Sequence, residues 1–502
     1  MLPHSHDICV RARELQDGDD EDVVSPTALA ALVTAVADEP DAGTAAAAVQ
    51  SCRCVVTLIK ALECVYTSAC DATDATTSTS GGNGEGADAG ALFDAVRTVV
   101  GVGRVVQEDF ADNGGATQLL APLVAFADRG NKENDSAATE HSGNEELAIV
   151  GKACRAIVTW CKGFEAGKLL LMAQDAHITM TACVERMNAG TTKASKALCT
   201  LCDAIRALCT GDDVEVAASK TFTHARLMGE VGAHHALVAA LKLQLDGEND
   251  TGTHGESDVN ALPSLCNAIK AVGANDEMCQ EIAADGAIQL LASVLASSTG
   301  KSDVVPPLTT SKAVFGLLRQ LAKSDTNKAL VIEQEQIIAS LHRCLGTGCS
   351  AEDDDDNEEG DDAAVTGTEG RGAHTDVGSN GACATQIPTK QEQQLAGVRE
   401  QAIGMLVSLS LRNPDAATMF CDDGIVAAVL ESMRFHRGHH GVQRQGCMMI
   451  RNVVVRCPEL RPGVLDLGAE KVIRGAKARW PDQCGDVGSA ALRDLGLENY
   501  NG

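Results

Sequence analysis

The sequence predicts an all-α protein, a right-handed superhelical solenoid of repeated helical units. Three observations predict this fold class: apolar residues recur at helical spacing, possible sharp turns return at repeat-like intervals, and aromatic residues are scarce. Hydrophobic residues make up 44% of the 502 residues, but aromatic residues only 2%. Small Ala, Leu, Val and Ile side chains suit thin layers between stacked helices, whereas a large globular core usually contains more aromatics.

The clearest repeat unit lies between Gly441 and Arg479. Its first apolar residues recur at helical spacing, Pro458 and Pro462 then interrupt the helix, and a second helix follows Gly468. Gly468 stands where two helices turn sharply and a side chain would be awkward. This order of helix, break, turn and helix is typical of an armadillo-type repeat.

The same turn position recurs along the chain. We place it at Gly115, Ala176, Gly232, Gly286, Gln336, Gly424 and Gly468. The intervals run from 44 to 88 residues, whereas armadillo repeats are about 40–47 residues long, so most intervals contain extra polypeptide. We therefore expect about seven to nine armadillo-type repeats, with loops of variable length along one edge.

The expected domain organisation follows from these interruptions. An acidic, mobile leader precedes N-terminal helices that contain one loop, armadillo repeats with three loops follow, and an acidic disordered insertion separates them from the last repeats and a capping helix. In that order, the parts are residues 1–25, 26–110 (loop 71–90), 91–348 (loops 128–144, 247–258 and 297–303), 349–394 and 395–502.

Charge and composition narrow the function. The formal net charge of −29 disfavours binding to nucleic acid or to an anionic membrane, because both require a cationic surface. No apolar run approaches the roughly 18 residues of a membrane helix, and the first twenty residues lack a secretory signal. The 20 cysteines are scattered through apolar segments, as expected of reduced thiols. We expect a cytoplasmic protein, with the nucleus as a further location.

The C-terminal repeats also resemble a known family. The segments GVQRQGCMMIRN, LDLGAE and AALRDLG are similar to the C-terminal end of the armadillo repeat-containing protein 6 family, over roughly the last hundred residues. The resemblance implies the armadillo fold. It implies little about mechanism, because that family is not tied to a defined activity.

Armadillo proteins that bind extended peptides carry an asparagine on the third helix of each repeat. At the corresponding positions this chain has Thr98, Thr159, Ala207, Ala271, Gln320, Ser408 and Asn452. Alanine cannot replace an amide that both donates and accepts, so an extended peptide along the middle repeats is not expected. Gln320, Ser408 and Asn452 remain candidates for contacting a short segment; alternatively, Asn452 only bridges neighbouring helices.

The C-terminal end is basic within an acidic protein. Residues 434–479 contain ten Lys and Arg against three acidic residues. Arg444, Arg451 and Arg474 are our candidates for binding a protein partner. An acidic run at residues 352–362 suggests an electrostatic gate that folds over these basic repeats and competes with an acidic partner; the alternative is a solvated loop that touches nothing.

We find no catalytic, cofactor or metal motif and expect a protein that is not an enzyme. The segment from Gly163 to Lys168 is one residue short of a P-loop and lacks its Ser or Thr. Cys199, Cys202 and Cys209 follow helical spacing, which favours a core stripe over a metal site. No acid or thiol accompanies His234-His235 at ligand spacing, so we interpret both as surface histidines. The competing function is a redox- or metal-responsive regulator that uses its cysteines.

Overall fold

The structure is a computed structural model of the whole chain. It describes residues 8, 10–11, 26–51, 53–71, 89–129, 140–190, 195–214, 216, 219–250, 261–296, 307–346 and 389–500. These residues form 25 α-helices and one short 3-10 helix, with no strand among them, which confirms the all-α fold class. The chain divides into two compact units, Met1–Ile338 (unit 1) and Ala339–Gly502 (unit 2).

After α2 (Pro26–Asp38), the helices repeat in triplets. The first helices are α3 (Ala42–Ser51), α6 (Arg104–Asp112), α9 (Glu165–Ala173), α12 (Thr221–Glu230), α15 (Asp276–Ala284), α18 (Asp325–Ile332), α21 (Pro414–Asp422) and α24 (Arg461–Asp466), which follows the 3-10 helix η2 (Pro458–Leu460). The second helices are α4 (Cys54–Asp71), α7 (Gly115–Arg129), α10 (Ala176–Ala189), α13 (Ala233–Asp250), α16 (Ala287–Ala296), α19 (Glu335–Gly346), α22 (Ile425–Phe435) and α25 (Ala469–Arg479). The third helices are α5 (Ala89–Val100), α8 (Glu140–Cys161), α11 (Ser195–Leu208), α14 (Leu262–Val272), α17 (Leu308–Leu321), α20 (Lys390–Ser410), α23 (His440–Arg456) and α26 (Pro481–Asp494).

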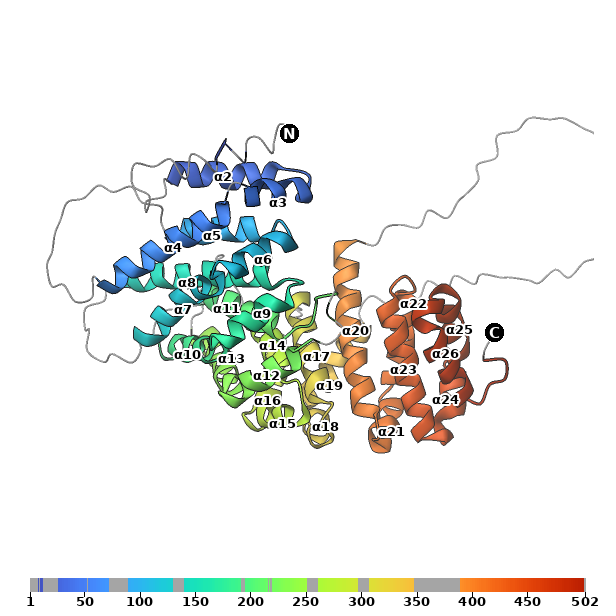
Figure 1. The fold of residues 1–502 in the computed structure, drawn as a ribbon. Coiled ribbons are helices and arrows are strands. Elements are labelled where there is room, and N and C mark those ends of the chain that lie inside the picture. The colour runs from blue at the N-terminus through green and yellow to red at the C-terminus, as the bar shows by residue number, and fades with distance from the viewer. Residues whose placement is uncertain are drawn as a thin grey trace, which may run out of the picture. The chain divides into compact units, whose positions relative to one another are not determined.

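Equivalent helices of successive triplets pack against one another. In unit 1, α2, α5, α8, α11, α14 and α17 each contact the next, and α4, α7, α10, α13 and α16 form a second such series (Figure 1). In unit 2, α20, α23 and α26 form the series of third helices, and α22 packs against α25. This sequential packing is that of an armadillo-type solenoid, in which each repeat buries its apolar face on its neighbours.

Left-handed residues connect most first helices to the second helices. The predicted turns are confirmed at Gly232, Gly286, Gly424 and Gly468, whose φ angles lie between +72° and +86°. Two predictions are wrong by one residue, because Gly114 (φ 84°) and Asp175 (φ 58°) hold the left-handed conformation. The prediction at Gln336 is wrong: this residue lies inside α19, and no described residue between α18 and α19 has a positive φ.

The predicted loops fall mostly outside the described residues. The leader 1–25 is described only at residues 8, 10 and 11, and the loop at 71–90 only at its ends. Most of the predicted stretches 128–144 and 247–258, the whole of 297–303, and 349–394 up to residue 388 also lie outside the description. Where the chain is described again, the helices reach further than expected: α8 begins at Glu140, α13 continues to Asp250 and α20 begins at Lys390.

The start of α20 has a local cause. The Thr389 hydroxyl accepts a hydrogen bond from the Glu392 backbone N–H at 3.2 Å, and Glu392 Oε2 accepts one from the Thr389 N–H at 2.7 Å. This reciprocal capping box satisfies two backbone donors that the first helical turn leaves unpaired. The helix therefore begins at Lys390, four residues before the predicted end of the acidic insertion.

Three of the aromatic residues of unit 1 form a cluster. Trp160 is fully buried, and its ring lies edge-on to Phe110 at 5.4 Å and to Phe164 at 5.8 Å between centroids. The Trp160 indole N–H donates to the Gln107 carbonyl at 3.0 Å. These contacts join α6, α8 and α9, so the aromatic cluster connects two consecutive triplets, while the other layers are filled mainly by aliphatic side chains.

Candidate functional site

The predicted groove positions all lie on third helices. Thr98, Thr159, Ala207, Ala271 and Gln320 occupy α5, α8, α11, α14 and α17 of unit 1, and Ser408 and Asn452 occupy α20 and α23 of unit 2. Each stands in the C-terminal half of its helix. The sequence pattern thus identifies one equivalent position on successive helices of each unit.

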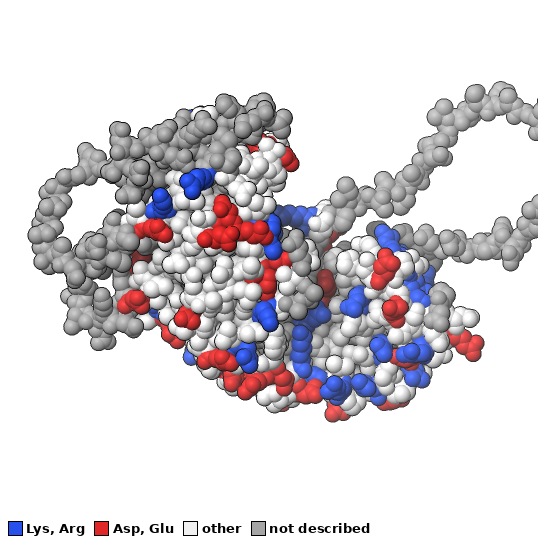
Figure 2. Space-filling view, in the orientation of Figure 1, with Lys and Arg blue, Asp and Glu red and all other residues white. Residues whose placement is uncertain are grey.

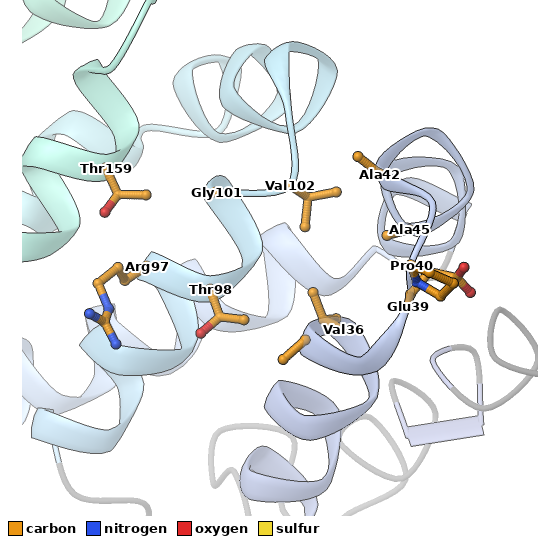
Figure 3. Close-up of a pocket in the computed structure, with 11 residues that line it drawn as sticks. Val36, Glu39, Pro40, Ala42, Ala45, Arg97, Thr98, Gly101, Val102 and Thr159 are labelled. Atoms are coloured by element: carbon orange, nitrogen blue, oxygen red, sulfur yellow. The ribbon is translucent and has the colours of Figure 1, made fainter. Parts of the chain in front are cut away.

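An open pocket of about 430 Å³ lies at the N-terminal end of this series. Figure 3 shows the residues from α2, α3, α5 and α8 that line it, with Thr98 and Thr159 from two successive third helices. Val36 and Val102 add apolar surface, and Arg97 adds a cation. Glu39 adds a carboxylate, and both threonine hydroxyls donate to carbonyls of their own helices. The pocket therefore offers two hydroxyl oxygens as acceptors, a cation, a carboxylate and apolar walls to a side chain or to a short segment.

Gln320 is already engaged with its neighbouring repeat. Its Nε2 donates to the carbonyl of Gly273, and its Oε1 accepts from the Lys323 ammonium at 2.8 Å. The backbone carbonyl of Gln320 also accepts a weak hydrogen bond from Cys279 at 3.6 Å. Because the amide binds the C-terminal end of α14, it positions α17 against α14. Only its remaining lone pairs are available to a ligand.

Asn452 makes the equivalent contact in unit 2. Its Nδ2 donates to the Val407 carbonyl at 3.0 Å and lies 3.5 Å from the Ser410 hydroxyl. Ser408 bonds to its own helix, through the Gly404 carbonyl at 3.3 Å. The geometry thus gives Asn452 a bridge between α20 and α23, and its Oδ1 is the atom left for a partner.

Arg444 and Arg451 lie on the exposed side of α23. The Arg444 guanidinium is exposed and contacts the Met448 sulfur at 3.5 Å. The Arg451 side chain is 46% exposed, and its Nε lies 3.0 Å from the Asp494 carboxylate of α26. Burial alone would raise the pKa of the Asp494 carboxyl, but hydrogen bonds and charges from Arg493 and Arg451 outweigh it and hold that pKa below its usual range. Arg451 is thus held in place and still accessible.

Arg474 lies in the other helical layer, on the second helix α25. Its Nε pairs with Glu470 at 2.8 Å, and its two terminal nitrogens donate to the carbonyls of Asn499 and Glu498 at 3.2 and 3.3 Å. These contacts hold the C-terminal segment against α25. The structure therefore places Arg444 and Arg451 together on one helix and separates Arg474 from them.

Figure 2 shows Lys and Arg side chains spread over the visible face of unit 2. The acidic run at residues 352–362, expected to cover this basic surface, lies outside the described residues. Their proposed contact is therefore a subject for experiment.

Most of the described cysteines are poor candidates for a reactive thiol. Burial raises the thiol pKa to about 12 at Cys161, Cys183, Cys209, Cys266 and Cys447. Burial also raises the pKa of Cys199 and places that of Cys202 well above its ordinary value. These environments keep the thiols protonated, whereas the thiolate is the form that acts as a nucleophile or as a metal ligand. The cysteines therefore behave as apolar side chains of the helix core.

The incomplete P-loop has a structural use. Lys168 is buried, donates to the Thr210 carbonyl at 2.6 Å and pairs with Asp212. Asp212 also accepts from the Gly163 backbone N–H at 3.1 Å. The glycine and the lysine of the motif thus bind the segment after α11, which leaves them unavailable to a phosphate.

One candidate site was not predicted from the sequence. His234, interpreted from the sequence as a surface residue, is only 2% exposed, and α15 brings Glu281 beside it and His235. Across the described part of the chain, these three residues form the one group of potential ligands close enough to share an ion. The pairing was hidden because 46 residues separate His235 from Glu281 in the sequence.

No single described helix is long and apolar enough to cross a membrane. Two helical segments joined by a bend, Ala42–Gln50 and Cys54–Cys64, reach that length and apolar content only when taken together.

Together, the helical triplets and their sequential packing define an armadillo-type helical-repeat protein. No protein-family model matches the chain, and no curated protein matches it. Among solved structures, an engineered protein is similar with a TM-score of 0.50 and 13% identity, covering 98% of this chain and 99% of that one. A structure concerning a phosphorylation switch in the interaction between cadherin and β-catenin gives 0.47 and 13%, covering 93% and 70%. A second engineered protein gives 0.36 and 16%, covering 53% and 87%. The similarity to the first engineered protein shows a similar fold and says nothing about function.

Proposed function

We propose that this chain is a non-catalytic scaffold or adaptor that binds a partner protein on the exposed surface of its third helices. Armadillo-type folds typically bind proteins, because stacked helices present a long surface of side chains. The function resides in the residues on that surface, so the site has to be argued from them and not from the fold.

The observation that carries the proposal is a row of accessible side chains on α23. Arg444, Met448, Arg451 and Val455 follow one another at spacings of four, three and four residues, so they share one helical face. Arg444 and Arg451 are exposed, Val455 is 39% exposed and Met448 is partly exposed. Alternating cations and apolar groups suit an acidic segment that also carries hydrophobic side chains.

The acidic insertion supplies a competitor for this surface. Residues 352–362 contain nine carboxylates in eleven positions, and the insertion is joined directly to α20, which packs against α23. We propose that the insertion occupies the basic surface until an acidic partner displaces it. Such a gate weakens with salt, because exposed charges are screened beyond about 8 Å at physiological ionic strength.

A direct titration tests the binding surface. The insertion is removed as residues 350–386, which keeps the Thr389 cap, and a fluorescent peptide of residues 350–364 is added to this variant and to the intact chain. We expect the peptide to bind the deletion variant more tightly than the intact chain at low salt. Arg444→Glu with Arg451→Glu is expected to weaken binding at least about tenfold, or ~1.4 kcal/mol.

Arg206→Glu with Arg226→Glu provides the matched control, because these side chains of unit 1 are 46% and 60% exposed and their reversal changes the net charge by the same amount without touching α23. The control should bind the peptide as the deletion variant does. Equal binding by the intact chain and the deletion variant would contradict the gate. Equal binding by the α23 double variant would contradict the surface itself.

We propose membership of the armadillo repeat-containing protein 6 family on the C-terminal segments quoted above, and a cytoplasmic or nuclear location. The competing function, a regulator that responds through its cysteines, is disfavoured by the raised pKa values of most of the described thiols. Alkylation of the folded protein distinguishes the two. A thiol that reacts rapidly at neutral pH would favour the regulator.

A further inference from the structure

Two histidines and two carboxylates meet where α13 packs against α15. His234 and His235 stand in the first turn of α13, and Glu281 and Asp285 stand at the end of α15. His234 Nε2 lies 3.1 Å from Glu281 Oε2, and His235 Nδ1 lies 2.6 Å from Asp285 Oδ2. One ligand atom from each of His234, His235 and Glu281 lies within 4.8 Å of the other two.

The buried imidazole is the unusual member of this cluster. The His234 side chain is 2% exposed, and neither ring nitrogen has a hydrogen-bond partner of acceptable geometry. A buried polar atom without a partner is costly, and such atoms in native proteins usually serve a ligand, an ion or a water molecule.

Comparison with the preceding repeat shows that the carboxylates are specific to this place. His177 of α10 is equivalent to His234, since both stand two residues after a left-handed turn residue. The helix equivalent to α15 is α12, the first helix of the next triplet, which packs on α10; Leu227 and Val231 of α12 and its C-cap occupy the positions of Glu281 and Asp285. One repeat thus has a buried histidine facing aliphatic side chains, and the next has paired histidines facing two acids.

We propose that His234, His235 and Glu281 bind a zinc ion that joins α13 to α15, with Asp285 orienting His235 from behind. Imidazole and carboxylate are suitable ligands for zinc, at about 2.0–2.2 Å, in tetrahedral geometry with water as the fourth ligand. Ligand atoms then lie about 3.3 Å apart, and Glu281, whose side chain is 43% exposed, is free to rotate inward. A carboxylate bound to the outer nitrogen of a ligating histidine is the usual support in zinc sites.

The local charges agree with a cation at this position. The C-terminal end of α15 carries a partial negative charge that attracts cations, while the N-terminal end of α13 opposes them by a similar amount. The two carboxylates therefore determine the sign of the local potential. Since α13 and α15 belong to consecutive triplets, the ion would act as a clamp between two repeats.

Zinc titration of the full-length protein, stripped with a chelator, tests the site by isothermal calorimetry. We expect one zinc ion per chain and increased hydrogen-exchange protection of α13 and α15 on binding. Glu281→Gln should weaken zinc binding at least about tenfold, because losing even a group that only supports a ligand lowers metal affinity by about that factor or more. Asp285→Asn should weaken it by less, because Asp285 acts through His235.

Glu277→Gln is the matched control, with the same substitution on an exposed residue of the same helix. It should bind zinc as the unaltered protein does. Replacing zinc with Co²⁺ separates the ligand types, because a thiolate ligand adds a strong sulfur-to-metal charge-transfer band in the near ultraviolet, and imidazole and carboxylate do not. Absence of binding, binding that Glu281→Gln leaves unchanged, or a thiolate band would each overturn the proposal.

Discussion

Gly114 and Gly115 are adjacent in sequence but are needed for different reasons. Gly114 has φ 84°, a left-handed conformation that side chains rarely adopt, although a Cβ there would meet open space. Gly115 has ordinary helical geometry, but a Cβ would overlap the ring of Phe110. The sequence predicted the turn at Gly115, because a glycine pattern alone cannot separate backbone conformation from close packing.

Alanine at these two positions should therefore respond differently to a second substitution. We expect Gly115→Ala to lower the free energy of unfolding by about 1–3 kcal/mol through overpacking, and Gly114→Ala by about 1 kcal/mol through backbone strain. Phe110→Leu should relieve part of the first effect and none of the second. Urea unfolding, followed by Trp160 fluorescence in a Trp480→Phe background, measures the three single and the two double variants. Additive effects of Gly115→Ala and Phe110→Leu would contradict the packing argument.

His436 makes the stability of unit 2 depend on pH. Burial, with the nearby Arg399 charge, lowers its pKa from 6.5 to about 4. The unfolded chain therefore binds a proton that the folded chain does not, between pH 6.5 and about 4. Stability attributable to the neutral ring is full above pH 6.5 and is lost as the pH falls toward 4.

His436→Gln should remove this part of the pH dependence. We expect the difference in unfolding midpoint between the variant and the unaltered protein to change between pH 7 and pH 4.5, with the unaltered protein losing more. His234, whose pKa is also lowered, remains in both proteins and so cancels in the comparison. Parallel pH profiles would contradict this, because they would show that His436 has the same pKa in the folded and the unfolded protein.

At the scale of helices, periodicity was sufficient for the fold and insufficient for the contacts. The third-helix positions from Thr98 to Asn452 were found because helices repeat at a regular spacing along the chain. The contacts of each side chain were not found in this way. Asn452 and Val407, which are hydrogen-bonded, are 45 residues apart in the sequence, and Glu281 and His235 are separated by a similar number of residues. Such pairings depend on how successive repeats stack, which a single sequence does not state.

The helix boundaries show the same limit. Composition placed the end of the acidic insertion at residue 394, but the capping box at Thr389 and Glu392 begins α20 earlier. The signal was present as a Thr followed three residues later by a Glu, and it was hidden by the polar residues that follow. Local chemistry, where a cap exists, is a better guide to a helix end than average polarity.

At the scale of the whole molecule, each repeat of a solenoid contacts only the adjacent repeats, so the effect of a substitution should remain local. Lys168 connects α9 to the segment after α11 through the Thr210 carbonyl and Asp212. Arg104 of α6 joins the same segment by binding Asp213 at 2.9 Å. This polar network joins consecutive triplets of unit 1, and unit 2 has a core of its own.

Lys168→Met tests how far a defect spreads. Removing the buried ammonium leaves the neighbouring acids and the Thr210 carbonyl without it, which should destabilise the local repeats by about 3 kcal/mol, the lower end for a broken buried pair because Asp212 is 39% exposed. Hydrogen exchange should quicken in α9 to α12, and α20 to α26 should keep their protection. Lys312→Met, at an exposed position of α17, should alter neither. If protection instead fell equally in both units, the repeats would be unfolding as one cooperative block, and stability would be a property of the entire array and not of each interface.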